Sequence, residues 1–268
     1  MPLSRGQAAL LSLVLPGLSQ VLLGRRLRGI IAFATTAGAL LLGWSLLQDR
    51  LWFFQPTTPT GWTRTIPILV LPEFANLVPT LFLSLCREPD TADSLRHVLM
   101  PRDGEHLASM LTGFSGILSA LWACDAWWLA DGRRAGRCDP PIAAAVSWLL
   151  PGAGHVLAGQ RSQGLLLGAA VLLMFAIGLA FGHGHSVDRA AGPLWWAAQA
   201  FCGIGVVFTS FVTAPWTMDS YPAQLELGRI LCTVAGLMNL MVMTDAFGVA
   251  ERDASLPAAV EPVPEAVA

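Results

Sequence analysis

Two stretches of this chain repeat one another and decide its fold. Residues 8–31 read AALLSLVLPGLSQVLLGRRLRGII, and residues 143–166 read AAAVSWLLPGAGHVLAGQRSQGLL. Eleven of these 24 aligned positions are identical, and no gap is needed. A repeat with so long a period indicates that a whole structural unit has been duplicated.

The composition is that of a membrane protein. Apolar residues make up 54% of the chain and charged residues 13%, whereas about 25% of a soluble domain is charged. Ten tryptophans are suited to anchoring helices at the two bilayer interfaces. The net charge is −2 and the sequence has no basic stripe, which argues against a nucleic-acid partner.

The apolar residues gather in eight segments, four in each half of the chain. An α-helix needs about 20 apolar residues to cross a bilayer, and a helix satisfies every backbone polar group within its own segment. We therefore predict an all-α, polytopic transmembrane bundle of about eight helices in two tandem repeats. The segments are approximately 7–23, 28–48, 66–86, 106–129, 142–158, 163–182, 193–213 and 228–249.

The duplication extends to the end of each half. With an offset of 120 residues, LSALWACDAWWLA (118–130) faces MNLMVMTDAFGVA (238–250), and both contain an Asp-Ala pair. The C-terminal tail is rich in Pro, Ala and Glu, which is typical of disorder. The predicted organisation is a first transmembrane repeat over 1–130, a linker over 131–141, a second transmembrane repeat over 142–253 and a disordered tail over 254–268.

The path of the two Pro-Gly segments leaves one alternative open. Each has about 17 residues, which can just span a bilayer as a helix, so four crossings per half are favoured. If these segments instead dip into the membrane and return, each half has three crossings and the halves are inverted repeats, as in many transporters. The arginines divide evenly between the two sides of the four-crossing arrangement, so they do not fix its orientation.

The repeated motif is interpreted as a tight helical hairpin with an interfacial arginine. Proline kinks a helix, the glycine after it permits close helix packing, and a later glycine supplies the positive φ that ends a helix. The arginine reaches the level of lipid phosphates, so a lipid-headgroup or partner site is the alternative interpretation. The motif residues are Pro16, Gly17, Gly24, Arg26 and Gly29 in the first copy, and Pro151, Gly152, Gly154, His155, Gly159, Arg161 and Gly164 in the second.

These residues resemble known families. LPGAGHVLAGQRSQG (150–164) is similar to the LPGxGxxxxGxxxxG opening of the two-helix transmembrane domain family, from which the first copy departs at Leu18 and Ser19. More of the chain resembles bacterial multi-pass membrane proteins of unknown function, which have a Pro-Gly-x-Gly-His opening and a late ELGxxxxxxAGLLNLLxxxDA segment. Here that segment is ELG (226–228) followed by AGLMNLMVMTDA (235–246). The resemblance implies a membrane architecture and supplies no catalytic site.

One carboxylate lies well inside an apolar segment. It is Glu73, and Asn76 lies one helical turn away. Intramembrane carboxylates are costly and often functional, so these two residues are the candidate site for proton- or cation-coupled transport. A hydrogen bond between helices is the structural alternative.

Other polar residues fit a structural role better. Asp125 and Asp245 occupy equivalent positions near a membrane boundary, and a duplicated scaffold retains the same hydrogen bonds in both copies. His155 stands where the first copy has Gln20, which favours hydrogen bonding over metal ligation. The pair of histidines in His183-Gly184-His185 lacks a third ligand nearby in the sequence, so it is a weak metal signal.

The sequence lacks the familiar enzyme motifs GxSxG, HExxH, Walker A and GxGxxG. We expect no enzyme activity, no cofactor and no bound metal. The favoured function is a scaffold or accessory subunit of a membrane protein complex in a bacterial inner membrane, with the lipid bilayer and other membrane proteins as partners. The alternative is a small-solute or ion transporter or channel that uses the repeat interface and Glu73.

Overall fold

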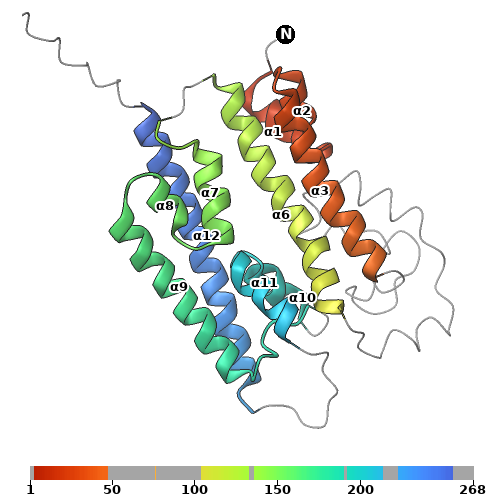
Figure 1. Cartoon of the computed structure of the whole chain (residues 1–268), viewed down its shortest axis with the longest axis vertical. Helices are drawn as coiled ribbons and strands as arrows, with labels where there is room; N and C mark the ends of the chain where they lie inside the picture. Colours follow the sequence, from red (N-terminus) through yellow and green to blue (C-terminus); the bar gives the residue numbers. More distant parts are fainter. Residues whose placement is uncertain are drawn as a thin grey trace, which may run out of the picture.

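The computed structural model describes residues 3–47, 76, 104–132, 136–189, 192–213 and 223–255. These ranges contain ten α-helices and no β-strand, so the all-α prediction is confirmed for them (Figure 1). The helices of the first half are α1 (Arg5–Val14), α2 (Leu18–Leu22), α3 (Arg26–Leu47) and α6 (Glu105–Ala130). Those of the second half are α7 (Pro140–Leu149), α8 (Ala153–Leu157), α9 (Arg161–Phe181), α10 (Pro193–Gln199), α11 (Gly203–Val212) and α12 (Leu225–Ser255).

In the part of the chain that the structure describes, four helices are long and apolar enough to cross a membrane. Each has at least 18 residues and few charges, and their length and composition indicate a membrane protein. The candidate spans, taken from the described residues, are Arg26–Leu46, His106–Ala130, Arg161–Phe181 and Leu225–Ser255.

Local sequence explains where the short helices begin. The Ser4 hydroxyl accepts a hydrogen bond from the Gln7 backbone N–H, and the Gln7 side chain accepts one from the Ser4 N–H, which forms a capping box at α1. Two prolines, Pro140 and Pro141, occupy the first turn of α7, where a missing N–H costs no helical hydrogen bond.

In each half two long helices pack antiparallel. Gly43 near the end of α3 lies against Thr112 near the start of α6, and Gly178 near the end of α9 lies against Cys232 near the start of α12. Figure 1 shows α3 and α9 running in one direction and α6 and α12 in the other. The two antiparallel pairs therefore have the same orientation in the molecule.

Each Pro-Gly segment forms two short helices that turn back, instead of the favoured single crossing helix. In the second copy, α7 begins beside the end of α12, where the Arg137 N–H donates to Asp253 at 2.7 Å. It reaches only the middle of α12, where Asn239 donates to the Trp148 carbonyl. The chain then returns through α8, and Gly159 lies beside Arg137. The Pro-Gly turn thus reverses the chain half-way along α12, as in the alternative path; the first copy, α1 and α2, is broken at the same point.

The segment predicted over 193–213 is also broken. It forms α10 and α11, which are separated at residues 200–202. This break lies at the tip of α7, where the Trp148 indole N–H donates to the Ala200 carbonyl at 3.0 Å and Gly203 lies against the Trp148 carbonyl. The two broken segments therefore meet each other inside the bundle.

Some predictions fall wholly or partly outside the described residues. The segment 66–86 is described only at Asn76, and the linker lacks residues 133–135. Of the tail, the structure describes Ala254 and Ser255, which belong to α12 although disorder was predicted from residue 254.

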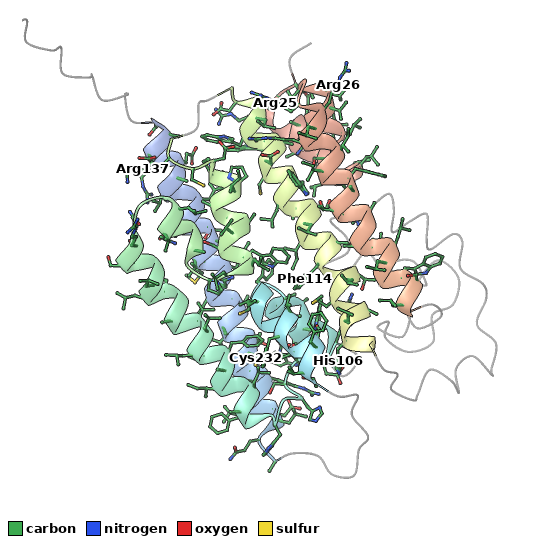
Figure 2. All side chains as sticks on the ribbon, viewed as in Figure 1. Arg25, Arg26, His106, Phe114, Arg137 and Cys232 are labelled. Carbon is green, nitrogen blue, oxygen red and sulfur yellow. The ribbon has the colours of Figure 1, made fainter. Side chains whose placement is uncertain are left out.

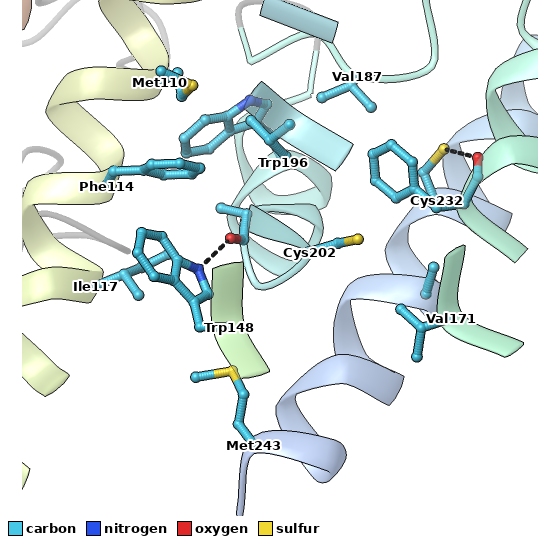
Figure 3. Packing of buried hydrophobic residues seen from close by; sticks show 14 of the residues in the cluster. Met110, Phe114, Ile117, Trp148, Val171, Val187, Trp196, Cys202, Cys232 and Met243 are labelled. Carbon is cyan, nitrogen blue, oxygen red and sulfur yellow. Dashed lines mark hydrogen bonds between the residues drawn. The ribbon is translucent and has the colours of Figure 1, made fainter. Parts of the chain in front are cut away.

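Side chains from both halves form one apolar core (Figure 3). Phe114 of α6 and Trp148 of α7 meet edge to face, with ring centroids 4.8 Å apart. Met110 and Ile117 of α6 and Trp196 of α10 belong to the same cluster. The core thus lies across the boundary between the predicted repeats.

Candidate functional site

The repeated motif adopts the same backbone conformation in both copies. Gly17 and Gly152 have φ angles of 86° and 79°, and Gly24 and Gly159 have φ angles of 81° and 91°. Glycine is the residue that adopts this left-handed region without steric cost. The first pair begins α2 and α8, and the second pair follows the ends of these helices.

The hairpin glycines also bring backbones into contact. A Cβ atom on Gly17 would overlap the carbonyl oxygen of Gly29, and one on Gly152 would overlap that of Gly164. In the second copy Gly154 is pressed against the backbone of α7. The short return helix therefore packs closely on both neighbours, which is how small residues pack helices in membranes.

The remaining motif residues divide by exposure. Pro16 and Pro151 are buried at the turn, whereas Arg26 and Arg161, the first residues of α3 and α9, are exposed. An exposed arginine beside apolar helix surface suits the polar boundary of a bilayer.

A polar network ties the first hairpin to both halves. The Gln20 amide donates to the Trp122 carbonyl at 2.8 Å and to Asp125 at 3.2 Å. The Arg28 guanidinium donates to Asp125 at 3.1 Å and to Asp139, which directly precedes α7, at 2.8 Å. One guanidinium therefore joins a carboxylate of the first half to a carboxylate of the second.

The second hairpin forms a related network with different chemistry. His155 Nε2 lies 2.9 Å from Asp245 Oδ2, and the Gln163 amide lies 3.4 Å from the same oxygen. His155 is fully buried, whereas 47% of the Asp245 side chain is exposed. At the sequence offsets of the repeat, the counterparts of His155, Gln163 and Asp245 are Gln20, Arg28 and Asp125.

Removing the Arg28 guanidinium should destabilise the protein more than the partial exposure of this side chain suggests. We expect Arg28→Gln to lower the free energy of unfolding by about 2–3 kcal/mol, because Asp125 is buried and would lose its countercharge. Chemical unfolding in detergent micelles measures the loss. Adding Asp125→Asn should restore part of it, because no unpaired carboxylate then remains. An unchanged midpoint for Arg28→Gln would contradict the ion-pair role.

The two networks predict which substitutions His155 tolerates. We expect His155→Gln to cost less than about 1 kcal/mol, because Gln20 makes the equivalent hydrogen bond in the first half. His155→Leu removes the bond to Asp245 and should cost about 1–3 kcal/mol. Thermal unfolding of the two variants compares them directly. If the glutamine variant were the less stable, the two positions would not be equivalent.

One buried amide holds the tips of the two broken segments. The Asn239 side-chain nitrogen donates to the carbonyls of Ser147 at 2.9 Å, Trp148 at 3.3 Å and Phe201 at 2.7 Å. Asn239 is fully buried. Carbonyls at a helix end lack partners within their own helix, so the amide supplies donors where both segments break.

The halves are joined again at the end opposite Arg28. Arg189 lies in the loop after α9, and its guanidinium donates to the Ser109 carbonyl and to the Thr112 hydroxyl, both at 3.0 Å. It also lies 4.8 Å from the centre of the Trp196 ring, within cation–π range. The Trp196 ring in turn covers Gly113, where a Cβ atom would overlap it. The second half thereby holds the start of α6.

The structure changes which polar residues stand out from those that the sequence suggested. Glu73 lies outside the described residues, and Asn76 is buried with its amide 3.2 Å from the Ser115 hydroxyl. Sequence reasoning missed Asn239 and Arg189. A lone amide inside an apolar run was a usable signal for Asn239, whereas nothing in the polar loop distinguished Arg189.

The histidines do not assemble a metal site in the described part of the chain, which holds no group of three or more His, Cys, Asp or Glu side chains suited to a metal. Burial, together with the neighbouring His106, lowers the pKa of His185.

One protein-family model matches the chain. It describes a family of unknown function (DUF6677) and matches residues 142–255, which take in α8 to α12 and all of α7 except its first two residues. The second half of the chain is therefore similar to this family. No curated protein matches the chain. No solved structure matches it either.

Proposed function

We propose that this chain is a non-catalytic, multi-pass membrane protein that serves as a scaffold or accessory subunit of a membrane protein complex. The observation that supports it is that the two halves are fixed to one another at three levels. Arg28 bonds to Asp139 at one end, Phe114 packs on Trp148 in the middle, and Arg189 bonds to α6 at the other end. A bundle fixed along its whole length offers partners a constant outer surface.

Among the described residues, the proposed topology has four full crossings, α3, α6, α9 and α12, and several half-depth segments. The hairpins α1–α2 and α7–α8 enter from one end, and α10–α11 enters from the other. Non-helical backbone at membrane depth is tolerated where protein covers it, and Asn239 and Trp148 cover it here. The described helices of each half then make an even number of crossings, which makes the halves parallel tandem repeats instead of inverted ones.

The described arginines favour one orientation. Figure 2 shows Arg25, Arg26 and Arg137 at one end of the bundle and His106 at the other. The positive-inside rule assigns the arginine-rich end to the cytoplasmic face of a bacterial inner membrane. Among the described residues, the first end holds Arg5, Arg25, Arg26, Arg28, Arg137, Arg161 and Arg252, and the second holds only Arg189 and Arg229, both buried.

Reporter fusions test this orientation. A fluorescent protein that folds only in the cytoplasm, fused after Ser255, should fluoresce, and alkaline phosphatase at the same point should be inactive. The matched control places both reporters after Phe181, at the opposite end of α9, where the pattern should reverse. Active phosphatase after Ser255 would contradict the assignment.

A transporter or channel is the second candidate, and one observation favours it. Broken helices that meet at mid-depth often form substrate sites in transporters, and α7 and α10 meet at Asn239. Transport by rocking of the halves would require the contacts of Arg28 and Arg189 to open. The transporter idea therefore predicts that breaking Arg189 changes flux, whereas the scaffold predicts that it changes only assembly.

Purification from the native membrane separates the two functions. Extraction in a mild detergent, followed by size analysis and mass spectrometry, should yield an assembly larger than one chain. Arg189→Ala should weaken the contact between the two halves and reduce the yield of that assembly. The matched control is Arg252→Ala, at an exposed position in the last turn of α12. A lone chain that supports solute flux in liposomes would overturn the scaffold.

A further inference from the structure

One face of α12 carries an exposed apolar stripe. Its side chains are spaced by three and four residues in alternation, which is the pattern of residues that pack one helix against another. Met241, the most exposed of them, has 72% of its surface open. The stripe consists of Leu227, Ile230, Val234, Leu237 and Met241.

The same face of α6 is buried. At the repeat offset of 120 residues the stripe corresponds to Leu107, Met110, Phe114, Ile117 and Leu121, all of which lie in or against the shared core. Phe114 is 7% exposed and its counterpart Val234 is 39% exposed. Ile117 is 4% exposed and its counterpart Leu237 is 47% exposed. Equivalent faces are thus covered in the first half and open in the second.

The second half itself covers the α6 face. Trp148 of α7 packs on Phe114, and Trp196 of α10 lies over Gly113. The counterpart of α7 in the first half is α1, so α1 has the surface that corresponds to this cover. It is open too: Leu10 is 64% exposed, and Leu13, the counterpart of Trp148, is only partly buried.

Each chain therefore has two exposed surfaces, the α12 stripe and the α1 face, which correspond to the two sides of the internal contact. We infer that a second copy of this chain covers the α12 stripe with its α1 face, so that the contact which joins the two halves is repeated between chains. The inference rests on the proposed scaffold function and its tandem repeats, and it identifies a second copy of the chain as the partner of the scaffold. Such a contact is head-to-tail, so it closes into a ring or extends into a filament.

The polar rim of the internal contact is also compatible with this arrangement. Within the chain, Arg28 bonds to Asp139, the residue directly before α7. The counterparts of these two residues are Gln163 and Ser4, which caps α1. A hydrogen bond between uncharged side chains would replace the ion pair, and no charge would be left unpaired.

Photo-crosslinking in the membrane tests the inference. Val234→p-benzoylphenylalanine puts an aromatic crosslinker at the counterpart of Phe114. We expect covalent dimers and higher multimers after irradiation, with the crosslink mapped by mass spectrometry to α1 of the second copy, near Leu13. The same crosslinker at Leu166, which is 73% exposed on α9, is the matched control and should give no chain-to-chain product.

Three results would overturn the inference. Crosslinks from residue 234 to residue 234 would show a two-fold dimer, and crosslinks to a different protein would show another occupant. Monomer alone after irradiation would show that lipid covers the stripe. A crosslink to a different protein would still be consistent with the proposed scaffold function. A lone chain in the native-membrane purification would contradict that function.

Discussion

Replacing Gly152 with alanine should strongly destabilise the second half. The backbone there has φ of 79°, and a Cβ atom would overlap the carbonyl oxygen of Gly164. The left-handed conformation costs about 1–2 kcal/mol for a residue other than glycine, and forced overpacking costs about 1–3 kcal/mol more. The sum is a large part of the total stability of a typical domain. We expect little monodisperse protein in detergent, measured by fluorescence-detected size exclusion.

Two alanine variants separate the causes of that loss. Gly24 has a positive φ but open space around it. Gly24→Ala should therefore lower the stability only by the cost of the left-handed conformation, about 1–2 kcal/mol. Gly6 is the second residue of α1 and has nothing within 4 Å of a new Cβ atom, so Gly6→Ala should stabilise the helix by at most about 0.5–1 kcal/mol. Normal yield from Gly152→Ala would show that the hairpin does not require backbone contact at this point.

The second large effect is expected at Asn239. Asn239→Leu has a similar volume but leaves the carbonyls of Ser147, Trp148 and Phe201 without this donor. An unpaired buried polar group costs about 1–3 kcal/mol, so we expect a total loss of about 3 kcal/mol or more. Chemical unfolding in micelles measures it.

A matched control lies on the same helix. Thr244 is exposed, and its hydroxyl bonds only to a carbonyl of its own helix, that of Met241. Thr244→Leu should therefore change the unfolding midpoint little. Equal effects of Asn239→Leu and Thr244→Leu would mean that the amide does not hold the two tips together.

The sequence was a good guide to features that depend on neighbouring residues. The helical class followed from long apolar runs, and the residues that turn the hairpins were visible as glycines in the Pro-Gly repeat. The sequence also indicated that the two polar networks are similar, because His155 aligns with Gln20 and Asp245 with Asp125. These signals are local, or they are repeated at a fixed offset.

Contacts between distant residues were not predictable in this way. The break at residues 200–202 contains no proline, and it is explained by Trp148 and Gly203, which are far apart in the sequence. The path of α7, which ends half-way along α12, likewise depends on Asn239, 92 residues after Ser147. Length alone favoured a full crossing, because about 17 residues can reach across a bilayer. Only the fold shows that the proline and glycine turn the chain first.

In the proposed topology, the half-depth hairpin has a consequence for biosynthesis. The tip of α7 leaves the ribosome long before the amide that completes it, since Asn239 follows Ser147 by 92 residues. At about 5–20 residues per second, that interval is roughly 5–20 s. Throughout this time the tip has polar carbonyls that hydrocarbon cannot satisfy. The hairpin therefore has to wait at the membrane surface or beside another protein, and it takes its final place only when α12 is made.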